Sequence, residues 1–125
     1  MIDHISVGVS ELERSAKFYE ATLAALGLTC LVTRPRTVGF GKAYPEFWIN
    51  LREAMPPVPP ESGVHICLRA KTTADVDAFH AAALATGGAS DGAPDIRPHD
   101  RVRYYAAFVL DPDGNRIEAV TFPSE

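Results

Sequence analysis

The stretch DPDGNRIEAV, residues 111–120, places a carboxylate inside an otherwise apolar strand. Its first half is rich in turn-forming residues, and its second half surrounds Glu118 with Ile117, Ala119 and Val120. A carboxylate in apolar surroundings without a partner carries a large desolvation cost. What Glu118 contacts therefore depends on how the rest of the chain folds.

The elements that lead to this stretch occur twice along the chain. Residues 2–9, IDHISVGV, alternate between faces as a strand does. Ser10 is then expected to be the N-cap of an amphipathic helix that ends at Gly27. Residues 63–70, GVHICLRA, alternate in the same way and precede a second helix. About three strands follow each helix, so the pattern predicts an internal βαβββ duplication.

The predicted fold is α+β, with two βαβββ modules that form one cup-shaped mixed sheet in a single domain, residues 1–125. Module one spans residues 1–54 and module two spans residues 63–125. Residues 55–62 contain four prolines, which exclude a helix or a central strand. This segment is predicted to be an extended linker.

Composition and charge exclude several classes of protein. The 125 residues are 46% hydrophobic with a formal net charge of −4, so no basic stripe for nucleic acid is predicted. No apolar run approaches the roughly 20 residues that span a bilayer, and no basic, apolar leader is visible. We therefore expect a cytoplasmic protein without nucleic-acid or membrane partners. Cys30 and Cys67 form no CxxC pair and are expected to be reduced thiols, with Cys67 buried.

Strand alternation places polar side chains of both modules on the sheet face opposite the helices. In each first strand the aliphatic residues face one way, and His4 or His65 faces the other. In the segment FWINL, Trp48 and Asn50 share that inner face, and in RIEAV so does Glu118. Aligning WINL with RIEA matches Asn50 with Glu118.

Two imidazoles and one carboxylate form a ligand set that leaves positions open on a divalent metal such as Fe, Mn, Ni or Zn. His4, His65 and Glu118 are therefore candidate ligands, and a metal would remove the desolvation cost of the carboxylate. Other interpretations stay open. A histidine in a strand is often a hydrogen-bonded structural residue, and Glu118 could instead pair with Arg69 or Arg116.

Further candidates line the same predicted face. Stepping by two along YYAAFVL places Tyr104 and Phe108 there. Tyr104 could bind a substrate oxygen or act as an acid, or it could be a packed aromatic. His99, in a loop next to a proline, could be a ligand, a base or a lid residue, or it could simply lie on the surface. Arg69 could hold a carboxylate or phosphate, and Trp48 could stack on the ligand or only pack in the wall.

Three stretches together resemble the vicinal oxygen chelate superfamily: DHISVGVSELERSAKFYEATLAALGL, GVHICLRAKTTADVDAFHAAAL and YYAAFVLDPDGNRIEAV. This superfamily contains glyoxalase I, extradiol dioxygenases, fosfomycin-resistance enzymes and bleomycin-resistance proteins. The resemblance implies paired βαβββ modules that form a cup around a divalent metal bound by His4, His65 and Glu118. It also implies a homodimer in which modules of two chains share each site.

Departures from the patterns of individual branches narrow the expected function. Small bacterial glyoxalase I enzymes carry a fourth ligand, a glutamate, where this alignment has Asn50, and the fosfomycin branch carries a tyrosine where Phe108 stands. The bleomycin-resistance branch lacks the triad. The glutamate missing at Asn50 argues against lactoylglutathione lyase activity itself. Because the chain is short, we nevertheless expect a metal-dependent enzyme of the lyase or isomerase type, related to lactoylglutathione lyase and acting on a small substrate with vicinal oxygens. Glu118 and Tyr104 would be catalytic, and Asn50 and Phe108 would contact the substrate. The alternatives are an extradiol-type dioxygenase and a non-catalytic small-molecule binding or resistance protein.

Overall fold

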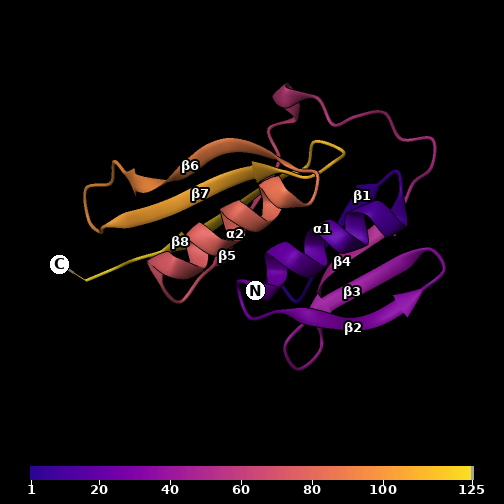
Figure 1. Ribbon diagram of the computed structural model, residues 1–125, viewed down its shortest axis with the longest axis horizontal. Coiled ribbons are helices and arrows are strands. Elements are labelled where there is room, and N and C mark those ends of the chain that lie inside the picture. The colour runs from indigo at the N-terminus through magenta and orange to yellow at the C-terminus, as the bar shows by residue number, and fades with distance from the viewer. Residues whose placement is uncertain (125) are drawn as a thin grey trace.

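The computed structural model describes residues 1–124 and confirms the α+β duplication. Each half contains one helix and one four-stranded sheet (Figure 1). The first half consists of β1 (Ile5–Val9), α1 (Leu12–Ala24), β2 (Thr29–Arg34), β3 (Thr37–Gly41) and β4 (Pro45–Leu51). The second consists of β5 (His65–Arg69), α2 (Thr73–Ala85), β6 (Ala89–Arg97), β7 (Tyr104–Leu110) and β8 (Arg116–Thr121). The connection between them holds a short 3-10 helix, η1 (Pro60–Ser62).

Both sheets have the same strand order, β1-β4-β3-β2 and β5-β8-β7-β6. In each sheet the first strand pairs in parallel with the last, and the other neighbours are antiparallel. The aliphatic residues Ile5, Val7 and Val9 of β1 pack toward the core as the alternation predicts. None of the helices in residues 1–124 is long and apolar enough to cross a membrane.

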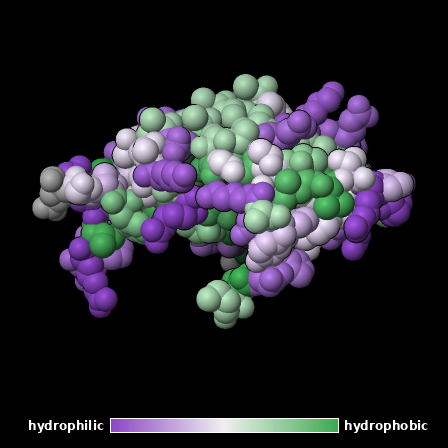
Figure 2. All heavy atoms as spheres, turned by 90° about the horizontal axis from the view of Figure 1, so that it is seen from below, coloured by the Kyte–Doolittle hydropathy of each residue, from purple (hydrophilic) through white to green (hydrophobic). Residues whose placement is uncertain are grey.

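The two helices lie side by side, and each covers one face of its own sheet (Figure 1). A single core runs through both halves, with Phe18 and Tyr19 of α1 and Phe79 of α2 fully buried. The two sheets share no strand pairing within residues 1–124. The expected mixed sheet is therefore divided, within one chain, into two separate sheets that each leave one face open. Seen from below, the outline of the molecule is hollowed between two projecting groups of side chains (Figure 2).

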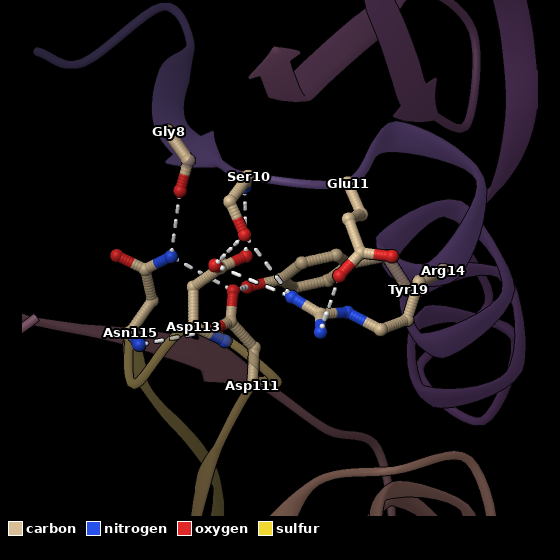
Figure 3. A network of polar contacts seen from close by, with 8 residues as sticks. All are labelled: Gly8, Ser10, Glu11, Arg14, Tyr19, Asp111, Asp113 and Asn115. Atoms are coloured by element: carbon tan, nitrogen blue, oxygen red, sulfur yellow. Dashed lines mark hydrogen bonds and ion pairs between the residues drawn. The ribbon is translucent and has the colours of Figure 1, made fainter. Parts of the chain in front are cut away.

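The turn between β7 and β8 joins the two modules (Figure 3). The Tyr19 hydroxyl of α1 donates a buried hydrogen bond of 2.6 Å to Asp111 Oδ2. Asn115 Nδ2 donates to the carbonyl oxygen of Gly8 in β1 over 2.9 Å. Residues 111–115 are therefore more than a turn, and we call them the DPDGN clamp.

Ser10 does not cap the first helix, so this prediction is wrong. The N-cap residue is Glu11, and its side chain makes no capping bond. Ser10 instead donates to the carboxylate of Asp113 in the clamp, through its backbone N over 3.0 Å and its Oγ over 2.5 Å. Arg14 Nη2 lies 3.3 Å from the same carboxylate. The Ser10 hydroxyl therefore bonds to an aspartate that is distant in sequence, and not to the backbone of the helix that follows it.

The buried carboxylate of Asp111 is surrounded by donors. Besides Tyr19, it accepts hydrogen bonds from the backbone N of Asp113 and from both N and Nδ2 of Asn115. Burial raises the pKa of the Asp111 carboxyl, and these hydrogen bonds partly offset the rise. Because the folded-state pKa lies above the unfolded one, the group favours the folded state below its unfolded pKa. That contribution is lost as the pH rises through the folded pKa.

Candidate metal site

Glu118 of β8 is only 2% exposed and lies on the open face of the second sheet. Its Oε1 lies 3.1 Å from His65 Nε2, and its Oε2 accepts a hydrogen bond from the Tyr104 hydroxyl. Strands β5 and β7 flank β8, and the residues directly opposite Glu118 are Cys67 and Phe108. His65 lies two residues from Cys67 along β5, and Tyr104 lies four residues from Phe108 along β7, so both share the face of Glu118. The carboxylate is thus held by one neighbour from each adjacent strand, as expected from strand alternation.

The two arginines considered as partners of Glu118 make other contacts. The Arg69 guanidinium lies 4.6 Å from the ring centroid of Phe122, and Arg116 pairs with Asp91 at 3.6 Å. Within residues 1–124 neither forms an ion pair with Glu118. The explanation of this buried carboxylate by an arginine is therefore wrong.

The donor atoms of His65 and Glu118 fit two positions on one divalent metal. Ligand atoms about 2.1 Å from an ion and about 90° apart lie about 3.0 Å from each other, and the observed separation is 3.1 Å. The ring of His65 is half exposed, so the open face gives access to the pair. In the part of the chain that the structure describes, no three His, Cys, Asp or Glu side chains gather to hold a metal.

His4 lies in the other module, one residue before β1 and not within it. Its Nδ1 lies 2.7 Å from Asp3 Oδ2, and its side chain is 53% exposed. A carboxylate at one ring nitrogen fixes the tautomer and leaves the lone pair of Nε2 for a metal, which is the usual arrangement of a ligating histidine. The geometry of His4 therefore suits a ligand, although its own chain does not bring it to His65 and Glu118.

The predicted equivalence of Asn50 and Glu118 is wrong. The strand register shows that Trp48 is the residue of module one that corresponds to Glu118 of module two. Two residues after each module's histidine, Ser6 pairs with Trp48 and Cys67 pairs with Glu118. Each histidine also precedes its helix by the same distance along the chain. Asn50 lies one pleat further along β4 and its Oδ1 is 2.6 Å from the Thr37 hydroxyl oxygen. Module one thus places an indole where module two places the carboxylate.

Tyr104 is a hydrogen-bond donor to Glu118 and part of an aromatic stack. Burial and the hydrogen bond to Glu118 raise the pKa of the Tyr104 hydroxyl, so it stays neutral and donates. Its ring stacks on His99 at a centroid distance of 5.9 Å and meets Phe122 edge-on at 5.5 Å. His99 Nδ1 accepts a hydrogen bond from the backbone N of Arg101. His99 therefore supports Tyr104 and orders its own loop.

A hollow of about 460 Å³ lies beside this cluster and is lined by Gly63, Val64, His65, Asp91, Phe108 and Arg116. The Phe108 ring centroid is 6.4 Å from that of His65. The volume of the hollow falls in the range of pockets for small ligands. Strand alternation predicted that Phe108 lies on this face. The strand register confirms the prediction, because Phe108 pairs directly with Glu118.

Two residues of this face were not singled out from the sequence. Phe122 continues the period of two from Glu118, so the alternation of β8 could have identified it. Arg97 reaches the Phe108 ring, with its guanidinium carbon 5.4 Å from the centroid. No sequence signal gives this contact, because the β6–β7 register shifts on both sides of Gly92.

Cys67 is exposed on the open face, so the expectation that it is buried is wrong. Its Sγ lies 4.0 Å from the Tyr104 hydroxyl oxygen. Although the residue is exposed, desolvation of the thiol and the nearby charge of Glu118 raise its pKa to about 11. The thiol is therefore a poor nucleophile at neutral pH.

Alkylation of Cys67 should be slow at neutral pH and should accelerate up to a pH of about 11. Iodoacetamide labelling of a Cys30→Ser variant in chelator, followed by mass spectrometry against pH, measures this directly. Glu118→Gln removes a charge that raises the pKa, so its labelling midpoint should fall. A wild-type midpoint at or below the ordinary thiol range would contradict the geometry.

Comparison with known proteins identifies the family. The sequence profile of the Glyoxalase/Bleomycin resistance protein/Dioxygenase superfamily matches residues 1–119. A glyoxalase/bleomycin resistance protein from Albidiferax ferrireducens T118 is 34% identical, with a TM-score of 0.83 over 94% of this chain and 96% of that chain. A glyoxalase-related enzyme from Fulvimarina pelagi is 20% identical, with a TM-score of 0.73 over 96% of this chain and 86% of that one. A lactoylglutathione lyase from Agrobacterium tumefaciens is 18% identical, with a TM-score of 0.65 over 96% and 92%. No match was found among curated proteins. The chain belongs to the Glyoxalase/Bleomycin resistance protein/Dioxygenase superfamily.

Proposed function

We propose that this protein is a metal-dependent enzyme of the lyase or isomerase type that acts on a small substrate with two neighbouring oxygens. The observation that carries the proposal is the pairing of His65 Nε2 with the buried Glu118 Oε1, 3.1 Å apart on an open sheet face. Fe, Mn, Ni or Zn are the metals that suit such ligands. One structural neighbour is named a lactoylglutathione lyase, so the fold is compatible with lyase chemistry.

The third ligand in this proposal is His4 of a second copy of the chain. Within residues 1–124, His4 hydrogen-bonds through Nδ1 and not through Nε2, and no group of metal-binding side chains surrounds it. Large apolar side chains are exposed next to both histidines: Ile2 and Tyr44 near His4, and Val64 beside His65. A second copy that covers them would form a homodimer with two equivalent shared sites. The exposed thiols of Cys30 and Cys67 suit a reducing compartment such as the cytoplasm.

The chain's own residues have distinct roles in this site. A bound metal would supply Lewis-acid stabilisation of negative charge on substrate oxygens. Tyr104 orients Glu118 by donating to one carboxylate oxygen, which leaves the other for the metal or for a substrate proton. Phe108 and Arg69 would contact the substrate from module two. Trp48 and Asn50 of the other copy would face them.

The test is the metal content of protein purified without chelator or histidine tag, measured by mass spectrometry. The wild type is expected to hold close to one metal per chain, and His65→Ala is expected to lose it. His80→Gln is the matched control, because His80 Nε2 is engaged with Ser90 Oγ at 2.8 Å on α2 and away from this face. A wild type that holds no metal and takes none up on reconstitution would contradict the proposal.

A further inference from the structure

The open face of module two carries an arginine, Arg97, that has no acidic partner among the described residues. The guanidinium of Arg97 lies over Phe108, and its Nη2 donates to the carbonyl oxygens of Ala93 and Ala106, the latter at 3.2 Å. Within residues 1–124 it forms no ion pair. Arg116, by contrast, has the carboxylate of Asp91 at 3.6 Å.

This guanidinium is held in place by the backbone and still has unused donors. A Cβ on Gly92 would lie 3.1 Å from the Phe108 ring and 3.2 Å from Arg97 Nη2, so the glycine makes room for both. The Nε of Arg97 is buried and has no hydrogen-bond partner. A buried N–H without an acceptor is costly. A carboxylate bound beside the guanidinium would offset part of that cost through its charge.

Arg97 stands at one end of a row that leads to the metal pair. Its guanidinium carbon is 5.4 Å from the Phe108 ring centroid, which is 6.4 Å from that of His65. His65 in turn contacts Glu118 at 3.1 Å. The row therefore offers a cation, then an aromatic surface, then the two metal ligands. Phe108 and His65, in the middle of the row, line the hollow of about 460 Å³.

We infer that the substrate is a flat carboxylic acid whose carboxylate binds Arg97, whose body lies over Phe108, and whose neighbouring oxygens reach His65 and Glu118. The position of the oxygens rests on the proposed function, whereas the acidic end rests on Arg97 alone. Arg34 over Trp48 and Arg69 over Phe122, at 5.9 and 4.6 Å, add positive charge to the same open faces. The protein as a whole carries a formal charge of −4, so these arginines place charge of the opposite sign on the open faces.

Two probes isolate the acidic end: 3,4-dihydroxybenzoate and 3,4-dihydroxybenzamide share the ring and the neighbouring hydroxyls and differ in charge. Anaerobic calorimetry on the protein as purified should show the acid binding about tenfold or more tightly than the amide, as expected for a charge-assisted contact. In Arg97→Gln that ratio should fall to about one. Lys17→Gln removes the same charge from α1 and should keep the ratio.

Equal binding of acid and amide by the wild type, or a ratio that survives in Arg97→Gln, would overturn the inference. Metal content in the same samples reports separately on the proposed function, since both probes carry the same diol. The thermal midpoint verifies that Arg97→Gln is folded. A measurement that needs no variant is salt: raising NaCl from about 0.05 to about 0.5 M should lower the wild-type ratio, and a salt-independent ratio would also overturn the inference.

Discussion

Glu118→Gln is expected to abolish tight metal binding while leaving the metal-free protein about as stable as the wild type. The amide has the same shape, its oxygen can accept the hydrogen bond from Tyr104, and its NH2 can donate to His65, both of which already contact this side chain. A well-paired amide in a buried site costs little, so the free energy of unfolding should change by less than about 1 kcal/mol. A neutral amide is a poor ligand for these metals.

Thermal or urea unfolding with chelator and with added metal separates the two effects. Metal at about 100 times its Kd should stabilise the wild type by about 2.7 kcal/mol and should not stabilise Glu118→Gln. Glu53→Gln is the control, because Glu53 forms only an exposed ion pair with Arg36. A large loss of stability in chelator would show that Glu118 is primarily structural. Retained stabilisation by metal would show that it is not a ligand.

Tyr19→Phe should destabilise the protein by about 2 to 3 kcal/mol, because it removes a donor from the buried carboxylate of Asp111. Tyr105→Phe is a matched control, since Tyr105 donates an equally short bond of 2.6 Å to Asp77, but at the surface. Its cost should stay below about 0.5 kcal/mol. The measurement is the urea midpoint and slope of both variants.

The cost of Tyr19→Phe should also depend on pH. The Tyr19 hydrogen bond lowers the pKa of an Asp111 carboxyl that burial has raised, so removing it should raise that pKa further. The carboxyl is protonated in the folded state at low pH and must ionise as pH rises, so the loss should be larger at about pH 7 than at about pH 4. Equal costs for Tyr19→Phe and Tyr105→Phe would contradict the role of the DPDGN clamp.

The duplication and the faces of its strands follow from the sequence alone. A period of two in IDHISVGV and GVHICLRA fixes which residues face the helices. The same period places Phe108 opposite Glu118 and Tyr104 on the same face, where its hydroxyl reaches Glu118. Such predictions succeed because they depend only on strand geometry and on each strand's immediate neighbours.

The arrangement of one module against the other could not be predicted in this way. Tyr19 and Asp111 are 92 residues apart, and no local pattern identifies an aspartate in a turn as a partner for a helix tyrosine. The strand register makes Trp48 the equivalent of Glu118. Aligning the short segments WINL and RIEA instead matched Glu118 with Asn50, two residues further along β4. The alternation of polar and apolar residues also does not show whether the sheets of the two modules pair into one continuous sheet within a chain.

The most direct test of a metal site shared between two chains is complementation in mixed dimers. His4→Ala and Glu118→Gln chains, expressed separately, should each bind no metal. Expressed together, the two form some dimers in which the intact His4 of one chain meets the intact His65 and Glu118 of the other. Random pairing should then restore about one quarter of the wild-type metal content. A mixed preparation that binds no metal, or a His4→Ala protein that keeps its metal, would contradict the shared site.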